Sequence, residues 1–318
     1  MVGFDIGGTK CAVSVGEVQN GELRILQKRK IPTDLSVSPY EMIDRLCGLA
    51  EEMTDDLSLI GISCGGPLDA ARGVILSPPN LPGWDEVAIV SYLQKRYGAA
   101  VCLENDANAC AVAEWRFGAG RGTKNMIFLT FGTGLGAGLI LDGKLYRGTC
   151  GNAGEVGHVR LARSGPVGFG KAGSFEGFAS GGGLAQMGRA AALEALRAGK
   201  PLAWCKTEAE VAEVSAARLA EAAKAGDGAA LRIWRAAARR LGQGLALLVD
   251  ILNPELIVIG SVYVRAEALL RDEMLRVMKK ECLAASLACV TVVGAGLGEA
   301  LGDYAALSLA AGLKGGTV

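Results

Sequence analysis

Two short glycine-rich segments, each set between apolar stretches, are the feature that most constrains the fold of this chain. The first is FDIGGTKCAVSV at residues 4–15 and the second is TFGTGLGAGLIL at residues 130–141. In each segment the apolar residues predict two strands and the glycines predict a turn between them. Ordinary tight hairpins are the alternative for either segment taken alone. The occurrence of such a glycine-rich segment in both halves of the chain predicts two similar lobes that each offer a turn to one ligand.

Strand and helix patterns alternate along the rest of the chain. A three-stranded meander is predicted for residues 1–33, and the helical pattern of 38–53 is followed by the buried strand LIGISC at 59–64. Helix 85–98 then precedes the strand AVCLEND at 100–106. This alternation indicates an α/β fold. The length of 318 residues suggests two domains, and the final helix is expected to return to the first of them.

Charge and cysteine usage exclude several classes of protein. Lys plus Arg and Asp plus Glu each number 33, so the net charge of zero removes the broad attraction on which nucleic-acid binding depends. The nine cysteines occur singly, as expected for reduced thiols in a core. No apolar run reaches the roughly 18 residues of a membrane-spanning helix, and no signal peptide precedes the first strand pattern. We therefore expect no nucleic-acid or membrane partner and a cytoplasmic location.

The two glycine turns are candidate phosphate sites. Without a Cβ, glycine lets backbone N–H groups approach an anion closely. A dinucleotide-binding fingerprint does not fit, because the second turn runs into a strand and not into a helix. The candidate phosphate-site residues are Asp5, Gly7, Gly8, Thr9 and Lys10 in the first turn and Gly132, Thr133, Gly134, Gly136 and Gly138 in the second.

Four motifs, in order, carry a resemblance to a known family. They are DIGGTK at 5–10, ENDANA at 104–109, GTGLGAG at 132–138 and GEVGH at 154–158. With them the whole chain resembles the ROK family of sugar kinases and sugar-responsive repressors. The resemblance implies a two-lobed actin-like, hexokinase-like (ribonuclease H-like) α/β ATPase fold with the active site in the interdomain cleft. It places residues 1–115 and about 300–318 in a small N-terminal lobe and residues 116–299 in a large C-terminal lobe.

The resemblance also implies roles for particular residues. Asp106 is the candidate general base, because a sugar hydroxyl is a poor nucleophile until a group accepts its proton. A helix cap made by Asn105 or Asp106 is the structural alternative, and it is compatible with catalysis. Gly260 and Ser261 are expected to flank the adenine. The sugar-binding candidates are Gly66, Asn80, Asn105, Asp106, Glu155, His158 and Glu176.

One segment departs from the family pattern. Many relatives carry C-x-C-G-x-x-G-C-x-E after the Gly-His, and three thiolates and the histidine bind a structural zinc. Here Val167, Phe169 and Ser174 occupy the cysteine positions. Valine and phenylalanine offer no lone pair to zinc, so we expect no zinc and predict that packing of Val167 and Phe169 replaces the metal.

The expected function is therefore an ATP-dependent sugar kinase that phosphorylates a hexose or N-acetylhexosamine, at O6. Mg²⁺ is expected with ATP, held through water and Asp5. Relatives imply a homodimer or tetramer. The alternatives are a sugar-responsive regulator, for which no DNA-reading module precedes the motif at residue 5, a sugar-binding protein without catalysis, and a kinase with a donor other than ATP, such as polyphosphate.

Overall fold

The computed structural model describes residues 1–315, and its contacts divide the chain into two compact units. Unit 1 comprises Met1–Phe128, Gly138–Ala153 and the segment from Ala295 onward, and unit 2 comprises Leu129–Ala137 and Gly154–Gly294. The first unit therefore extends past the predicted boundary at residue 115 and regains a short segment after the second glycine turn. Among the helices of residues 1–315, none is both long and apolar enough to cross a membrane.

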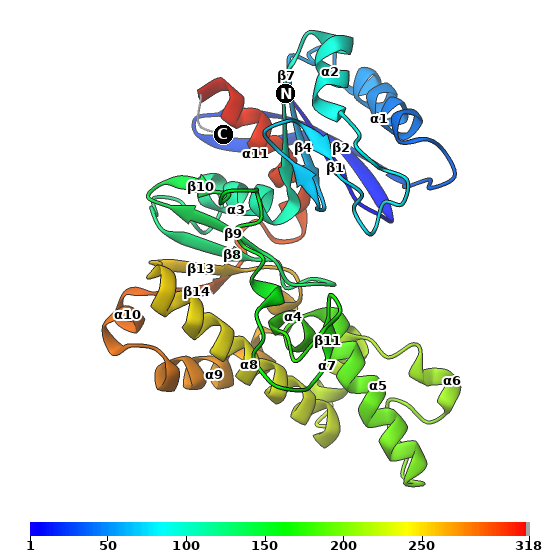
Figure 1. Ribbon diagram of the computed structural model, residues 1–318, viewed down its shortest axis with the longest axis vertical. Helices are drawn as coiled ribbons and strands as arrows, with labels where there is room; N and C mark the ends of the chain where they lie inside the picture. The colour runs from blue at the N-terminus through cyan, green and yellow to red at the C-terminus, as the bar shows by residue number, and fades with distance from the viewer. Residues whose placement is uncertain (316–318) are drawn as a thin grey trace. The chain divides into compact units, whose positions relative to one another are not determined.

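Unit 1 is built on a five-stranded sheet with the order β3-β2-β1-β4-β7 (Figure 1). Antiparallel pairing joins β1 to β2 and β2 to β3, which confirms the predicted meander. Parallel pairing joins β1 to β4 and β4 to β7, so the carboxyl ends of these three strands lie at one edge of the sheet. The strands are β1 (Val2–Ile6), β2 (Lys10–Gln19), β3 (Glu22–Pro32), β4 (Leu59–Cys64) and β7 (Ala100–Asn105).

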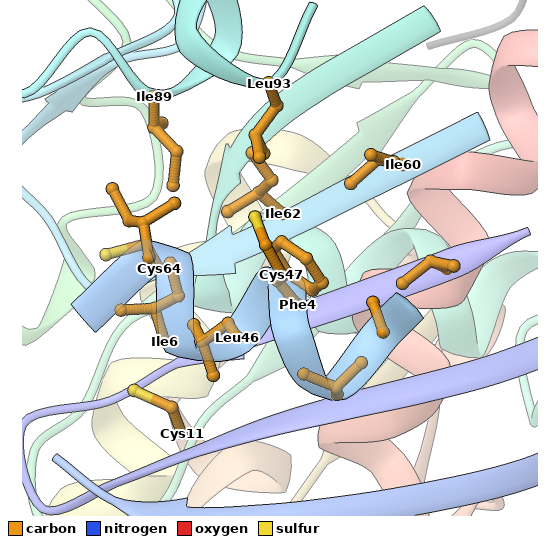
Figure 2. Close-up of a cluster of buried hydrophobic side chains, with 14 of the residues drawn as sticks. Phe4, Ile6, Cys11, Leu46, Cys47, Ile60, Ile62, Cys64, Ile89 and Leu93 are labelled. Carbon is orange, nitrogen blue, oxygen red and sulfur yellow. The ribbon is translucent and has the colours of Figure 1, made fainter. Parts of the chain in front are cut away.

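One face of this sheet packs against helices α1 (Pro39–Met53) and α2 (Ile89–Tyr97). Figure 2 shows Leu46 and Cys47 of α1 and Leu93 of α2 over the strand side chains Phe4 and Ile62. All five residues are 0% exposed. Successive strand residues point to opposite faces, so every second residue of β1 and β4 enters this core.

The other face packs against helix α11 (Leu301–Gly315) at very short range. A Cβ on Gly61 would lie 2.1 Å from the carbonyl oxygen of Ala306, and a Cβ on Gly3 would lie 2.8 Å from the Cβ of Ala306. Glycine in the strands therefore allows the helix to touch the sheet. Helix α3 (Asp106–Phe117) packs beside α11 through small residues, among them Ala109 and Ala305.

The remaining elements of the first half are short. Strands β5 and β6 form a two-stranded sheet, and β9 and β10 form an antiparallel hairpin within a larger sheet. A Cβ on Gly138 would lie 2.6 Å from the carbonyl oxygen of Ala107, so β9 touches the first turn of α3. The bounds are β5 (Leu68–Asp69), β6 (Val74–Ile75), β8 (Met126–Leu129), β9 (Ala137–Leu141), β10 (Lys144–Tyr146) and the 3₁₀ turn η2 (Gly298–Ala300).

Unit 2 is mostly helical around the parallel strand pair β13 and β14. Its long helices α8 and α9 pack against each other (Figure 1), and α8 buries Trp234 and Leu241. The bounds are η1 (Val156–His158), β11 (Val167–Gly168), β12 (Lys171–Ala172), α4 (Phe175–Phe178), α5 (Gly181–Arg197), α6 (Glu208–Val211), α7 (Ala216–Lys224), α8 (Gly228–Leu252), β13 (Leu256–Ile259), α9 (Val262–Glu281), α10 (Ala284–Cys289) and β14 (Thr291–Gly294).

Candidate functional site

The carboxyl ends of β1, β4 and β7 gather the candidate residues of unit 1. Asp5 is the next-to-last residue of β1 and lies opposite Ser63 of β4, and Ser63 lies opposite Glu104 of β7. Asp106 follows β7 directly as the first residue of α3. Ligands of open parallel sheets bind at this edge, because each strand delivers a loop there. Residues from motifs that are far apart in the sequence, Asp5 and Asp106, therefore lie at the same edge of the sheet.

Asn105 and Asp106 together cap helix α3. The amide nitrogen of Ala107 donates to Oδ1 of Asn105 at 3.0 Å and to Oδ1 of Asp106 at 2.8 Å. These bonds satisfy a helix N–H that has no partner in the helix and hold both side chains at the start of α3. Asp106 keeps contact with solvent, but dense protein atoms around its carboxyl group raise its pKa. Asp106, the predicted base, is therefore also one of the two residues that cap α3.

The first glycine turn lies against the loop that contains Asn80. A Cβ on Gly8 would lie 2.3 Å from the carbonyl oxygen of Asn80, which excludes any side chain at this position. A Cβ on Gly66 would lie 3.4 Å from Nδ2 of Asn105. Thr9 and Lys10 are exposed at the start of β2. The phosphate-site candidate Gly8 and the sugar-site candidate Asn80 are thus in contact within one unit.

Asp5 lies among further charged groups on the sheet face that α11 covers. Burial, followed by the carboxylates of Asp303 and Asp106, raises the pKa of Asp5 to about 6, and Lys28 opposes this rise. Asp303 accepts a hydrogen bond of 3.1 Å from Oγ of Ser14 and pairs with Lys28. A bound cation near Asp5 would relieve the repulsion among these carboxylates. Residues 1–315 contain no group of three or more His, Cys, Asp or Glu side chains that could hold a metal ion, so a Mg²⁺ at this place would keep most of its ligands as water or phosphate oxygens.

In unit 2 the second glycine turn lies under the first residues of α5. The amide nitrogens of Gly181 and Gly182 donate to the carbonyl oxygens of Gly132 and Thr133 at 2.7 and 3.1 Å. Ser180 caps α5 through a bond of 2.9 Å from the amide of Gly183. These contacts with the start of α5 hold the conformation of the turn.

The two adenine-site candidates also lie beside this turn. The amide of Gly260 donates to the carbonyl of Leu129 at 2.9 Å, at the end of β8. Oγ of Ser261 lies 3.8 Å from the position of a Cβ on Gly132. Ser261 has a φ of +55°, an uncommon value for a non-glycine residue. Gly136 exchanges hydrogen bonds with Thr130, which closes the turn into β9.

Glu176 joins the second glycine turn to the GEVGH segment. Its Oε2 accepts a hydrogen bond of 3.0 Å from the amide of Leu135. A Cβ on Gly157 would lie 3.2 Å from the Cβ of Glu176, so the 3₁₀ turn between Glu155 and His158 packs on this side chain. Unit 2 therefore gathers the candidates Glu155, His158 and Glu176 beside its glycine turn.

The segment that replaces the family's zinc motif is organised by hydrogen bonds and not by apolar packing. Val167 is 45% exposed and Phe169 is 77% exposed, so the prediction that they pack inward is wrong. The Gln186 side chain of α5 instead accepts from the amide of Val167 at 2.9 Å and donates to its carbonyl at 2.8 Å. The edge of a short hairpin can be held this way because its backbone groups lack a strand partner.

The same hairpin contacts His158. Phe169 meets the His158 ring edge-on at 6.2 Å between centroids, and Lys171 Nζ donates to the His158 carbonyl at 2.8 Å. Ser174 is buried, where its Oγ accepts from the amide of Gly177 and caps α4. Carbon side chains at 167 and 169 and a capping hydroxyl at 174 do not fit a zinc centre.

Several residues of this site carried no assigned role in the sequence. Glu104 is buried and pairs with Arg147, Gln186 holds the hairpin, and Asp303 lies beside Asp5. A carboxylate in the otherwise apolar strand AVCLEN was a signal for Glu104. Arg147, Gln186 and Asp303 are ordinary residues of a loop and two helices, and no local pattern marks them.

Comparisons with known proteins identify the family and the fold of this chain. The ROK family pattern matches residues 1–312. Glucokinase from Streptomyces coelicolor is 31% identical over 322 residues, which cover 97% of this chain and 96% of the relative.

Two solved structures are similar over nearly their whole length. A ROK hexokinase from Thermus thermophilus has 32% identity and a TM-score of 0.81, with 99% of each chain covered. A ROK family glucokinase from Streptomyces griseus, in complex with glucose and AMPPNP, has 32% identity and a TM-score of 0.74, with 97% of each chain covered. The predicted α/β, two-lobed actin-like ATPase fold is thereby confirmed. The chain belongs to the ROK family.

Proposed function

We propose that this ROK protein is an ATP-dependent sugar kinase that transfers the γ-phosphoryl group to a hydroxyl of a hexose or N-acetylhexosamine, at O6. The enzyme class, a sugar kinase, follows from the family and from glucokinase relatives that are aligned over almost the whole chain. The observation that best supports the finer proposal is the position of Asp106. Its carboxyl group lies at the carboxyl edge of the parallel strands, where it accepts a hydrogen bond from the amide of Ala107 and is open to solvent.

In the proposed reaction, Asp106 accepts the proton of the attacking sugar hydroxyl. The sugar oxygen forms a bond to the γ-phosphorus while the bond from that phosphorus to the bridging oxygen breaks, and ADP leaves with its electrons. Phosphoryl transfer depends mainly on positioning and on stabilising charge, so the protein needs few reacting groups. A raised pKa makes Asp106 a better proton acceptor once it is ionised.

The nucleotide would be held by the two glycine turns. Gly7, Gly8, Thr9 and Lys10 offer backbone amides, a hydroxyl and a charge from unit 1, and the turn from Gly132 to Gly136 offers amides from unit 2. Asp5 would hold Mg²⁺ through water, and the ion would supply positive charge to the phosphate oxygens. Gly260 and Ser261 would contact the adenine ring of the nucleotide.

The sugar would be held by mixed donors and acceptors, as a polyol requires. Asn80, Asn105 and the backbone at Gly66 contribute from unit 1, and Glu155, His158 and Glu176 contribute from unit 2. Because the hairpin with Phe169 contacts His158, this hairpin is proposed to influence which sugar is accepted. A cytoplasmic location and a homodimeric or tetrameric state stay predictions.

A coupled ADP-release assay over glucose, mannose, fructose, allose, N-acetylglucosamine and N-acetylmannosamine tests the proposal. We expect turnover with ATP and Mg²⁺ for at least one of these sugars. No turnover with any sugar, or turnover with polyphosphate alone, would contradict it. Sugar-dependent binding to DNA in a gel-shift assay without turnover would instead favour the regulator branch of the family.

Asp106→Asn tests the base. Asparagine keeps the size of the side chain and can still accept from the amide of Ala107, but it cannot take up the proton. We expect kcat to fall by about 10²- to 10⁴-fold. Asp142→Asn, in the exposed turn between β9 and β10, is the matched control and should keep normal turnover. Normal turnover of Asp106→Asn would show that another group accepts the proton.

A further inference from the structure

Glu104 is a buried carboxylate two residues before Asp106, the proposed base. Its residue is 2% exposed, in strand β7 between Leu103 and Asn105. An ionised carboxylate in such a place is strongly unfavourable unless its oxygens are paired. The partners of Glu104 therefore indicate why the chain keeps a charge there.

Both oxygens of Glu104 are bonded to groups around Asp106. Oε1 accepts from the amide nitrogen of Asn105 and from Nδ2 of Asn108, each at 3.0 Å. These two residues flank Asp106 in the sequence, one before it and one a half-turn after it. Asn108 Oδ1 is buried without a hydrogen-bond partner, so the bond to Glu104 decides the orientation of this amide.

The second oxygen of Glu104 binds Arg147. Nε of Arg147 lies 2.7 Å from Oε2 of Glu104, and the arginine side chain is 33% exposed. Arg147 follows β10, and its carbonyl accepts a bond of 3.0 Å from the amide of Ala153, which closes the loop 147–153. The ion pair therefore connects strand β7, which ends at Asn105, to a loop of the same unit.

We propose that the Glu104–Arg147 ion pair is a positioning device that fixes the start of helix α3 and, with it, the carboxyl group of Asp106. The role of Asp106 rests on the proposed function, whereas the effect on α3 does not. Arg147 neutralises Glu104 and orients its carboxylate, Glu104 holds Asn105 and Asn108, and these two residues hold the backbone between them. Neither Glu104 nor Arg147 exchanges a proton with substrate in this scheme.

An apolar residue could fill the volume of Glu104, but it could not accept these bonds. Removal of Arg147 leaves a buried carboxylate without its charge partner, and such a group takes up water or a proton, or moves. Each response changes the position or charge of Oε1, to which Asn105 and Asn108 donate. A displacement of about 1 Å near reacting atoms can lower a rate by about 10²-fold. A shift of the Asp106 carboxyl group by about this distance would therefore be enough to lower kcat.

Arg147→Met is the main test, with Arg121→Met as the matched control. Arg121 also pairs with a glutamate, Glu22, in unit 1, but both partners are exposed. We expect Arg147→Met to lower kcat by about 10- to 100-fold while the KM for ATP changes by less than about threefold, because positioning acts on the reacting atoms. Arg121→Met should leave both constants unchanged.

Arg147→Lys and the double variant Glu104→Gln/Arg147→Met separate positioning from general loss of structure. Lysine restores the positive charge but not the planar guanidinium group, so we expect partial recovery of kcat. The double variant removes the unpaired carboxylate and should recover part of the kcat lost in Arg147→Met, which a double-mutant cycle measures. Equal kcat for Arg147→Met, Arg147→Lys and the wild type would overturn the proposal.

Hydrogen exchange without ligands tests the effect on α3 independently of any activity. We expect the amides of residues 104–109 to exchange about tenfold faster in Arg147→Met than in the wild type, with no change in Arg121→Met. Unchanged exchange in both variants would overturn the positioning role even if the enzyme is active. If the wild type phosphorylates no sugar but exchange rises as expected, the proposed function fails and the positioning role of the ion pair stands.

Discussion

Asp5→Asn should make the protein more stable at neutral and alkaline pH while it abolishes activity. Asp5 lies on the sheet face covered by α11, where a Cβ on Gly302 would lie 3.1 Å from its Oδ2. Burial and the carboxylates of Asp303 and Asp106 raise its pKa from 3.8 to about 6, against the opposing charges of Lys28 and Lys30. Asparagine resembles the protonated acid in size and carries no charge at any pH.

The sign and size of the effect follow from this pKa. Because the folded-state pKa lies above the unfolded value, folding favours the protonated acid, and this favourable contribution is lost as pH rises through about 6. A difference of roughly two pKa units corresponds to about 3 kcal/mol in the free energy of unfolding. At pH 8 Asp5→Asn should therefore exceed the wild type by up to about 3 kcal/mol, and near pH 4 the difference should shrink to below about 1 kcal/mol.

Urea denaturation of both proteins between pH 4 and pH 8 measures this difference, since the titrating groups that do not interact with Asp5 cancel between them. Asp142→Asn, in an exposed turn, is the control for the replacement of a carboxyl group by an amide. A gain that is independent of pH, or a loss of stability at pH 8, would refute the reasoning. Loss of turnover together with a gain in stability would mark Asp5 as a group retained for function at the expense of the fold.

Two further predictions concern backbone contacts. Gly61→Ala would place a Cβ 2.1 Å from the carbonyl oxygen of Ala306 and should lower the free energy of unfolding by at least about 1–3 kcal/mol, whereas Gly48→Ala, in α1 with no atom within 4 Å, should raise it by about 0.5–1 kcal/mol. Equal effects in thermal unfolding would contradict the close packing of α11. Gln186→Ala should increase proteolysis at 165–172 more than Gln186→Glu, which can still accept from the amide of Val167. One tightly bound zinc per chain in the wild type would show that this segment is held differently.

The elements near the candidate site were largely predictable because their signals are local. The meander of β1, β2 and β3 follows from apolar strands and glycine turns, and the helix after Asn105 begins where the cap places it. The failed prediction was that Val167 and Phe169 turn inward. Hydrophobicity favours burial, but the hairpin that carries them is held at its backbone by Gln186, and its side chains stay exposed.

The contacts that the sequence did not predict join residues far apart in the chain. Glu104 pairs with Arg147 across 43 positions, and Ser14 bonds to Asp303 across 289. Each of these side chains is compatible by itself with an exposed loop, strand or helix. Only the packing of α11, β7 and the loop after β10 makes them partners.

The amino-acid sequence by itself determined the family, the α/β class and the residue types of the candidate site. Strand periodicity, glycine turns and short polar motifs depend only on residues that are close together in the sequence. The tertiary structure alone decided which charges are paired and which are left to oppose one another. Pairing and burial depend on distances between segments that the order of residues does not specify, and these distances set the pKa of Asp5 and the environment of Asp106.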